Sequence, residues 1–261
     1  MSPWTRARLA EDVAALGLLS GDAVLTHAGL RAIGPILGGP DALIDAIMDA
    51  IGPDGTLLGY CDWQFEDDYA DRPELRAQIP PFDPLRSRAA RENGAFPEML
   101  RTVPGARRSA NPGASCAALG GRAEWFTADH AMHYGYGPLS PFGRLVDVKG
   151  KVLMIGAPLD TMTLLHHAEH LANIPNKRVI RYKAPVLVAG RTEWLDFEEF
   201  DTSDPVIHGL PDDYFATIVA DFLEAGESRR GKVGDADAVL VDAASIVAFG
   251  IDWLEKRYPS P

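Results

Sequence analysis

The feature that most limits the fold of this chain is a strand–helix–strand pattern near its start. Residues 23–26 and 56–60 are two short apolar runs typical of buried strands. Between them, residues 42–51 have the spacing of an amphipathic helix, Asp41 is expected as its N-cap, and a Gly-Pro-Asp-Gly turn follows at residues 52–55. Two buried strands joined by a helix form a βαβ unit, so the pattern predicts an α/β fold.

The rest of the chain continues this pattern without repeats, a linker or a low-complexity tract. We expect further helices at residues 5–16, 91–101, 161–173 and 243–256, and further strands at residues 151–155, 184–188 and 238–241. Residues 62–90 interrupt the pattern with acidic residues and prolines, which predicts a loop or lid. The sequence therefore predicts a single α/β domain over residues 1–261, with a mixed, largely buried sheet flanked by helices and an acidic loop excursion.

Charge and cysteine content restrict the partners of the chain. Its 25 Lys and Arg against 37 Asp and Glu give a net charge of −12, which repels nucleic acids and anionic membranes and attracts cations. A polycationic substrate fits this field, although many proteins are acidic for solubility alone. Two cysteines cannot build a disulfide framework, and we find neither a signal peptide nor a run of about 18 apolar residues, so we expect a cytoplasmic protein.

The densest group of ionisable side chains is expected on a helix that begins directly after Asp160. At about 100° per residue, His166 and Glu169 lie one turn apart on one face, together with Thr163 and His170. A carboxylate beside an imidazole fixes its tautomer and raises its basicity, which suits a general base. The opposite, apolar face is expected to pack on the sheet and contains Leu164, Ala168 and Leu171.

The same residues allow two other interpretations. The order His166, Glu169, His170 fits the H-x-x-E-H pattern of inverted zinc proteases, in which two histidines bind zinc. A zinc enzyme needs a third ligand, and no downstream helix offers an obvious acid in a matching context. The face could also be solvated and without function, so the residues alone leave base catalysis, zinc binding and a surface role open.

Several motifs, in order along nearly the whole chain, resemble those of the aminoglycoside 3-N-acetyltransferase family. They lie at residues 25–34 (LTHAGLRAIG), 53–57 (PDGTL), 81–84 (PFDP), 108–112 (RSANP), 134–137 (YGYG), 163–169 (TLLHHAE) and 230–237 (RGKVGDAD). The chain departs from the family at Ala28 and Gly29, where relatives often have serine, and at Asn111, where many have histidine. Several spaced motifs in the right order are far more specific than any one of them.

The resemblance implies transfer of an acetyl group from acetyl-CoA to the 3-amino group of a 2-deoxystreptamine aminoglycoside, which gives antibiotic resistance. It implies direct transfer in a ternary complex without a metal, and the family's histidine and following acid fall on His166 and Glu169. His166, oriented by Glu169, would remove a proton from the substrate ammonium before the nitrogen attacks the thioester. Backbone N–H groups at residues 27–29 are candidates for stabilising the oxyanion.

Two groups of residues are predicted to bind the donor. His27, Ala28 and Gly29 follow a strand, where α/β sheets have their ligand crevices, and a glycine-rich loop lets backbone amides approach phosphates. The second group lies in a basic stretch of an otherwise acidic chain and consists of Arg108, Ser109 and Ser115. Such glycines can also be needed only for the turns of a connecting loop. Arginines of this kind are also often exposed surface residues without a ligand.

The polycationic sugar is predicted to bind acidic and aromatic residues. Carboxylates pair with ammonium groups, and aromatic rings stack on sugars or cations. The candidates are Tyr60, Asp62, Glu92, Tyr134, Asp160 and Asp201, together with the acidic run that continues from Asp62 to Asp71. A run of charges is more often a solvated face, so each residue has a competing surface interpretation.

Other activities stay open on the sequence alone. Cys61 invites an acyl-enzyme mechanism like that of arylamine N-acetyltransferases, but it ends a buried strand without an identifiable activating neighbour, which favours a small core residue. The same fold could acylate another amine metabolite, or the chain could bind an antibiotic or CoA without catalysis. A homodimer is compatible with the sequence, which does not define the oligomeric state.

Overall fold

The computed structural model describes residues 2–65, 72–202, 205–226 and 228–259. It contains the expected βαβ unit, made of β1 (Ala23–Ala28), α2 (Pro40–Ile51) and β2 (Thr56–Tyr60), with β1 and β2 parallel. The N-cap of α2 is Gly39, so the prediction of Asp41 as N-cap is wrong. Gly39 adopts a φ of 72°, which glycine tolerates, and Asp41 instead lies in the first turn, where its charge favours the helix dipole.

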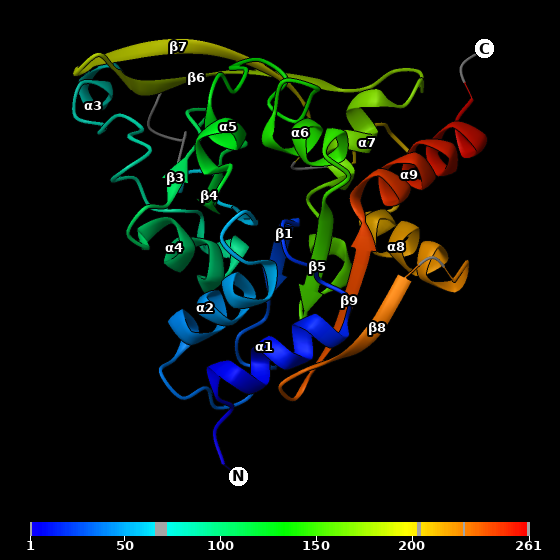
Figure 1. Ribbon diagram of the computed structural model, residues 1–261. Helices are drawn as coiled ribbons and strands as arrows, with labels where there is room; N and C mark the ends of the chain where they lie inside the picture. The colour runs from blue at the N-terminus through cyan, green and yellow to red at the C-terminus, as the bar shows by residue number, and fades with distance from the viewer. Residues whose placement is uncertain (1, 66–71, 203–204, 227, 260–261) are drawn as a thin grey trace.

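Among the described residues, seven strands form one mixed sheet in the order β3-β4-β2-β1-β5-β9-β8. The central strands β2, β1 and β5 are parallel, whereas the outer strands pair antiparallel. The strands not yet given are β3 (Arg107–Arg108), β4 (Cys116–Gly120), β5 (Lys151–Ile155), β8 (Ser228–Val233) and β9 (Ala236–Asp242). Figure 1 shows the sheet in the middle of the molecule.

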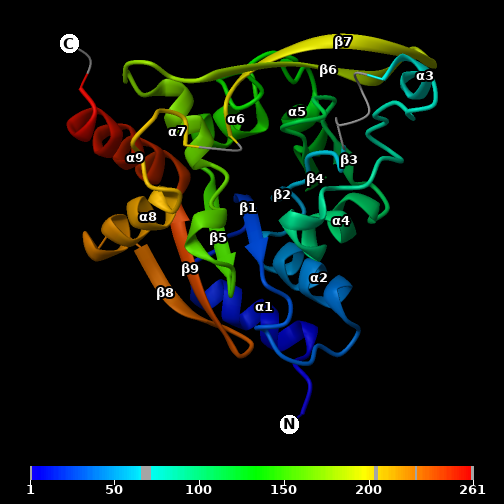
Figure 2. The ribbon, with the colours of Figure 1, turned by 180° about the vertical axis from the view of Figure 1, so that it is seen from behind.

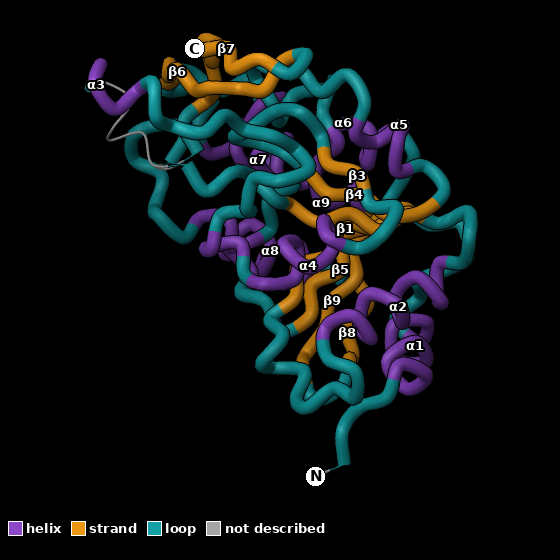
Figure 3. The backbone as a smooth tube through the Cα atoms, turned by 90° about the vertical axis from the view of Figure 1, so that its left-hand side faces the viewer, coloured by secondary structure: helices purple, strands orange, loops and turns teal. Residues whose placement is uncertain are grey.

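Helices cover both faces of the sheet, because successive side chains of each strand point to opposite sides. In β1, Val24 packs in one apolar cluster and the next residue, Leu25, in another. The Val24 side includes residues of α1 (Arg6–Ala15), α2 and α4 (Ala95–Thr102), and Figure 3 shows α1 and α2 together on one side of the strands. The Leu25 side includes residues of α5 (Ala123–Thr127), α6 (Pro141–Asp147), α7 (Leu165–Leu171), α8 (Tyr214–Glu224) and α9 (Ala243–Arg257). The predicted fold class is confirmed.

A long hairpin lies outside the main sheet. It consists of β6 (Val179–Val188) and β7 (Arg191–Phe200), and Figures 1 and 2 show it crossing the top of the molecule above α5, α6 and α7. The excursion predicted at residues 62–90 contains the short helix α3 (Pro73–Arg76), and a bridge between Phe82 and Val186 fixes its proline-rich part to β6. The described part of the excursion is therefore a loop held against the hairpin.

Two helices begin later than predicted, each after a 3-10 turn, at Arg91–Asn93 and Leu159–Thr161. The first turn ends at Gly94, whose φ of 77° breaks the helix predicted at residues 91–101 before α4 begins. The local sequence patterns also did not predict the strands β3, β4, β7 and β8 or the helices α3, α5, α6 and α8. Strand β8 lies at the edge of the sheet with mostly exposed side chains, so it lacks the apolar pattern of a buried strand.

Helix α7 is shorter than predicted and packs on the C-terminal helix. It begins at Leu165 rather than directly after Asp160, because a separate 3-10 turn precedes it. Leu171 is 43% exposed, so its predicted place against the sheet is wrong. A Cβ added to Gly250 of α9 would come within 3.0 Å of Leu165 and 3.2 Å of Ala168. This close approach to α9 sets the position of α7.

In the part of the chain that the structure describes, no helix has both the length and the apolar composition needed to cross a bilayer.

Candidate active site

A cavity of about 420 Å³ opens at the carboxyl ends of the parallel strands. The ends of β1 and β2 and the segment after β5 supply much of its wall, as expected for the ligand crevice of an α/β sheet. The cavity brings together many of the residues predicted from the sequence, namely His27, Ala28, Gly29, Tyr60, Asp62, Glu92, Asp160 and His166. Its size suits a small-molecule site.

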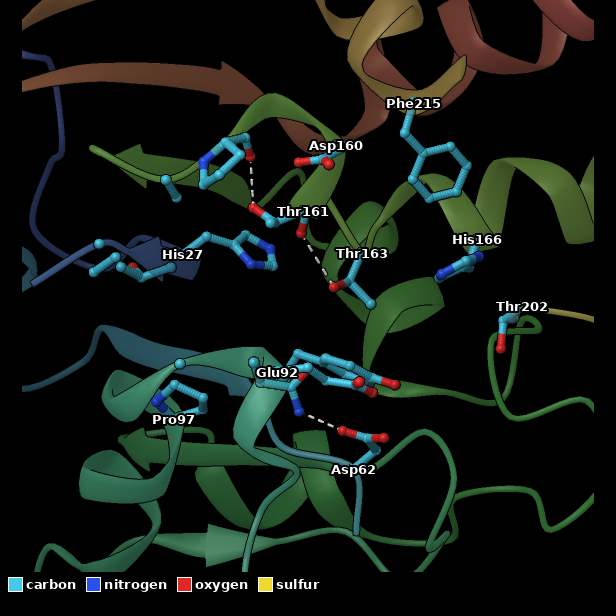
Figure 4. A pocket seen from close by; sticks show the side chains of 18 of the residues that line it. His27, Asp62, Glu92, Pro97, Asp160, Thr161, Thr163, His166, Thr202 and Phe215 are labelled. Atoms are coloured by element: carbon cyan, nitrogen blue, oxygen red, sulfur yellow. Dashed lines mark hydrogen bonds between the residues drawn. The ribbon is translucent and has the colours of Figure 1, made fainter. Parts of the chain in front are cut away.

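A histidine–carboxylate pair from α7 lies at this cavity. His166 Nδ1 is 2.6 Å from Glu169 Oε2, and the Tyr214 hydroxyl donates to the other carboxylate oxygen, Oε1. When Nδ1 carries the proton that it donates to Glu169, Nε2 is left as the basic nitrogen. Nε2 has no hydrogen-bond partner among the described residues, and Figure 4 shows the ring beside the cavity. The pair therefore has the arrangement of an oriented general base.

Aromatic side chains hold the His166 ring. The ring centroids of Tyr136 and Phe215 each lie 4.8 Å from that of His166. The Tyr136 hydroxyl is 2.7 Å from that of Tyr60, and both are within hydrogen-bond distance of the Gly113 carbonyl. Burial raises the pKa of both phenols well above the ordinary value, so both stay protonated. These contacts limit the rotation of the imidazole.

His27 contributes a neutral imidazole to another part of the cavity, and Figure 4 shows it on the far side of Thr163 from His166. Burial lowers the pKa of His27 to about 4, so the ring is uncharged at neutral pH. Its Nε2 and the Thr26 hydroxyl are buried without a hydrogen-bond partner among the described residues. Because buried polar groups are normally paired, we expect a bound molecule or water to complete this part of the site.

The main chain after His27 is less available than the sequence suggests. The Gly29 N–H donates to the Ile155 carbonyl at 2.8 Å, so this one of the three candidate N–H groups is already engaged; stabilisation of an oxyanion by the main chain at residues 27–29 stays a prediction. A Cβ at position 29 would lie 2.3 Å from the Gly156 carbonyl oxygen, so only glycine permits this close approach to the segment after β5. Close packing of the main chain against Gly156 therefore explains the glycine at position 29 without a contact to a bound molecule.

Asp62 and Glu92 form an acidic wall. Burial raises the pKa of Asp62 from 3.8 to about 7, although the Asn93 amide, which donates to Oδ1, acts in the opposite direction. The charge of Glu92 adds to the increase. Asp62 forms no ion pair with another described residue, although the charge of Arg108 partly offsets the increase in its pKa. A largely desolvated carboxylate of this kind is suited to receive an ammonium group.

A second hollow of about 470 Å³ adjoins the first. The two share Asp160, His166, Thr202 and Phe215 in their walls. Pro205, Asp212 and Tyr214 complete the wall of the second hollow. His166 therefore lies where the two hollows, here called compartments, meet.

Arg108, Ser109 and Ser115 lie inside the protein and not at the cavity. The Arg108 guanidinium donates to the carbonyls of Cys61 and Ser87 and to the Ser115 hydroxyl. Ser109 accepts a hydrogen bond from a main-chain N–H of β4 at 3.0 Å. The structure gives these residues internal partners, so we leave them out of the proposed donor site.

Two other predicted residues lie away from the described cavity wall. The Tyr134 hydroxyl donates to Glu198 at 2.6 Å. Asp201 is buried and forms an ion pair with Arg178. The acidic residues at 66–71, which continue the run from Asp62, lie outside the described residues.

The H-x-x-E-H pattern does not form a convergent set of ligands. His170 lies edge-on to the ring of Phe200, at a centroid distance of 5.5 Å, and burial lowers its pKa to about 4. His167 Nδ1 is bonded to the Tyr136 carbonyl at 2.6 Å. In the described ranges, no three His, Cys, Asp or Glu side chains are arranged to hold a metal ion. The geometry thus favours the His166–Glu169 pair over the zinc interpretation.

Cys61 has the surroundings of a core residue. It is fully buried, and burial raises the pKa of its thiol to about 11. A thiolate nucleophile would need the opposite shift. This environment agrees with the prediction that Cys61 is a small core side chain.

The residues that hold the His166 ring and Glu169 were not predicted from the sequence. Tyr136 lies in the YGYG motif at residues 134–137, which marked the family but was not assigned a role. Tyr214 and Phe215 begin α8, a helix absent from the sequence prediction. Their approach to His166 and Glu169 depends on packing between α8 and the segment before α7, which no local pattern reports.

The fold and the cavity together define an α/β enzyme with a histidine–carboxylate pair where two hollows adjoin. The chain belongs to the aminoglycoside 3-N-acetyltransferase family, whose sequence profile matches residues 25–255. It is 48% identical over 263 residues to aminoglycoside N(3)-acetyltransferase III of Pseudomonas aeruginosa, covering 98% of this chain and 95% of the relative. The resemblance inferred from the motifs is confirmed.

Solved structures agree with this assignment. The chain superposes on AAC-IIIb in a binary complex with CoASH with a TM-score of 0.96, at 57% identity and with 100% of both chains covered. It superposes on AAC-VIa bound to sisomicin with a TM-score of 0.94, at 39% identity, covering 99% of this chain and 100% of the other.

Proposed function

We propose that this protein transfers the acetyl group of acetyl-CoA to the 3-amino group of a 2-deoxystreptamine aminoglycoside and thereby confers antibiotic resistance. The observation that carries the proposal is the His166–Glu169 pair at the junction of two compartments, in a chain of this family. Relatives solved with CoASH and with sisomicin support the class of donor and of acceptor.

The pair supplies the base that this reaction needs. An amine of this kind is mostly protonated at neutral pH, so its nitrogen has no free electron pair. His166 Nε2 takes one proton, and Glu169 stabilises the imidazolium that forms. The nitrogen then attacks the carbonyl carbon of the thioester, and the C–S bond breaks as the amide forms. The nitrogen loses its second proton in this step, the thiolate takes up one proton to leave as the CoA thiol, and the proton held by His166 passes to water. The net reaction releases one proton to water.

Acidic groups of the cavity fit the acceptor. Asp62, Glu92 and Asp160 offer carboxylates to the ammonium groups of the sugar, and Tyr60 forms part of the wall. The net charge of −12 attracts a polycation to the protein as a whole.

The end of β1 fits the reacting part of the donor. His27 is uncharged, and its Nε2 has no hydrogen-bond partner among the described residues, so it can form a hydrogen bond with a carbonyl oxygen without an opposing charge. Ala28 has only a methyl side chain at this point of the cavity wall, which leaves space for the thioester. We therefore assign the donor to the end of the cavity at residues 27–29.

The test compares His166→Ala with the control His208→Ala, an exposed histidine outside the cavity. CoA release is measured with a thiol reagent, and an added acetyl group is measured by mass spectrometry. We expect His166→Ala to fold and to lose at least about a hundredfold in kcat, because general base catalysis contributes about that much, while the control keeps its turnover. Near-normal turnover in a folded His166→Ala variant would refute the assignment of the base.

The choice of acceptor is tested with the wild-type protein. A panel of aminoglycosides with a free 3-amino group is compared with analogues acylated at that position and with simple metabolite amines. Turnover only with the first set supports the proposal. Preference for a metabolite amine would assign the chain to an acyltransferase of the same family fold with another substrate.

Two other expectations stay predictions. The cytoplasm would supply the acetyl-CoA, and fractionation of cells that express the protein would test this location. A homodimer would be detected as twice the chain mass by light scattering.

A further inference from the structure

The carboxylate that orients His166 has a second partner. Glu169 is 2% exposed, and its oxygens divide between two donors: Oε2 faces His166 Nδ1 at 2.6 Å, and Oε1 accepts the Tyr214 hydroxyl. Tyr214 is itself 6% exposed and is the first residue of α8. The next residue, Phe215, lies against the His166 ring at 4.8 Å. The start of α8 therefore contacts both members of the pair.

We propose that Tyr214 is a positioning residue that completes a three-residue chain, Tyr214–Glu169–His166, and holds the base in its reactive orientation. This inference rests on the proposed role of His166. The Tyr214 hydroxyl does not reach the substrate in this scheme; it acts through Glu169 alone.

The physical reason is that a buried carboxylate has to be fixed to orient an imidazole. With one oxygen bonded, the carboxylate can rotate about its last bond and lose its alignment with Nδ1. A donor on the other oxygen prevents this rotation and also stabilises the buried negative charge. Groups that orient a ligand or base in this way typically change activity by about 10- to 100-fold when removed.

Other charged groups near the pair have to be considered for its pH dependence. Lys177 lies close enough to interact favourably with Glu169, and its Nζ donates to the His170 carbonyl at 2.9 Å. Glu199 of β7 interacts with His166, and burial raises its pKa to about 7. Asp160 and Asp212 share the wall of the second hollow with His166. All of these groups are retained when only the Tyr214 hydroxyl is removed.

The removal of this hydroxyl should move the pH profile in a defined direction. Without the Tyr214 hydroxyl, the negative charge of Glu169 loses one of its two hydrogen-bond donors. The charge then depends more strongly on the protonated imidazole of His166 for its stabilisation. The pair then binds its proton more tightly, and the free base forms only at higher pH. We expect the half-maximal point of kcat on the acid side to rise by about one pH unit.

The experiment compares Tyr214→Phe, which keeps the ring, with the control Tyr258→Phe, whose hydroxyl donates to the Gly209 carbonyl at 3.3 Å. The kcat is measured at saturating concentrations of both substrates from pH 5.5 to 9, so that titration of substrate-binding groups has less effect. Tyr214→Phe is expected to lower kcat about 10-fold and to leave both KM values within about twofold. It is also expected to shift the acid side of the pH profile of kcat to higher pH. The control Tyr258→Phe is expected to change none of these quantities.

A double-mutant cycle separates positioning from general stability. In the Glu169→Gln background, Tyr214→Phe should lower kcat by less than about twofold, because its effect passes through the carboxylate. Equal losses in both backgrounds, or a Tyr214→Phe variant with an unchanged profile, would overturn the proposal.

The folding of the variants and the activity of His166→Ala give two further outcomes. If Tyr214→Phe fails to fold but the double variant Glu169→Gln/Tyr214→Phe folds, the hydroxyl acts on buried Glu169 as proposed. If neither variant folds, Tyr214 is a structural residue and the proposal is wrong. His166→Ala is assayed in parallel. If that variant stays active, the assignment of the base has failed, whereas an inactive His166→Ala with a fully active Tyr214→Phe refutes only the role of Tyr214.

Discussion

Replacing Asp62 with asparagine should make the protein more stable and less able to bind its acceptor. The ionised form of Asp62 is disfavoured because the carboxyl is buried, and this burial raises its pKa from 3.8 to about 7. Because the folded protein binds this proton more tightly than the unfolded chain, the free energy of unfolding falls as the pH rises from about 4 to about 7. Above pH 7 the full penalty of the buried charge is present.

The magnitude follows from the increase in pKa. About three units at about 1.4 kcal/mol each set an upper limit of about 4 kcal/mol. Water in the open cavity lowers this value, so we expect Asp62→Asn to gain about 1 to 2 kcal/mol at pH 8. An asparagine oxygen can still accept the hydrogen bond from Asn93. For a chain of this size the gain corresponds to about 2 to 8 °C in Tm.

Urea unfolding and thermal melts at pH 8 and pH 5 test this prediction. The gain at pH 5 should be less than half of that at pH 8, because Asp62 is then mostly protonated in the folded protein. The KM for the aminoglycoside should rise at least about 10-fold, as expected for loss of a charged partner, without a change in the KM for acetyl-CoA. The control is Asp196→Asn, a surface residue paired with Lys183. Lower stability at pH 8, or an equal gain at both pH values, would contradict the reasoning.

Three further predictions concern the pair and the core. Glu169→Gln should lower kcat about 10- to 100-fold in the CoA-release assay with little change in KM, because the imidazolium loses its counter-charge; an unchanged kcat would show that the carboxylate does not act on His166. Arg108→Met should lower the free energy of unfolding by about 3 kcal/mol, because buried hydrogen-bond acceptors lose the guanidinium. It should leave the KM for acetyl-CoA unaltered. A raised KM for acetyl-CoA with normal stability would instead support the contact with acetyl-CoA predicted from the sequence. Cys61 should resist iodoacetamide in the native protein at pH 8, because its thiol pKa is about 11, and Cys61→Ala should retain activity; rapid alkylation with loss of turnover would reopen the acyl-enzyme mechanism.

Much of the fold could be predicted from local sequence patterns. The apolar runs of β1, β2 and β5 and the amphipathic α2 have the periodicity of their structures, so their positions agree with expectation to within a few residues. Helix boundaries were less accurate where backbone conformation decided them. Gly94 breaks the helix predicted at residues 91–101, and Gly39 replaces Asp41 at the start of α2.

The candidate site could be predicted only in part. The His166–Glu169 contact depends on helical spacing within a few residues, so the sequence is sufficient to find it. Arg108 shows the limit of this reasoning: a basic loop residue suggests an anion site, but its guanidinium donates to interior atoms of Ser115, Ser87 and Cys61, two of which are more than 20 positions away. Tyr214 was missed for the same reason, because its contact with Glu169 spans 45 positions.

The packing of α7 on α9 also bears on when the site is completed during synthesis. Helix α7, which contains His166, rests on Gly250, and strand β9, which precedes α9, pairs with β5 beside β1. A growing chain that has produced all the cavity residues up to Phe215 still lacks the surface that positions His166. Nascent or truncated chains that end before residues 243–257 should therefore be inactive even with every cavity residue present, and a larger side chain at position 250 should disturb catalysis from outside the cavity.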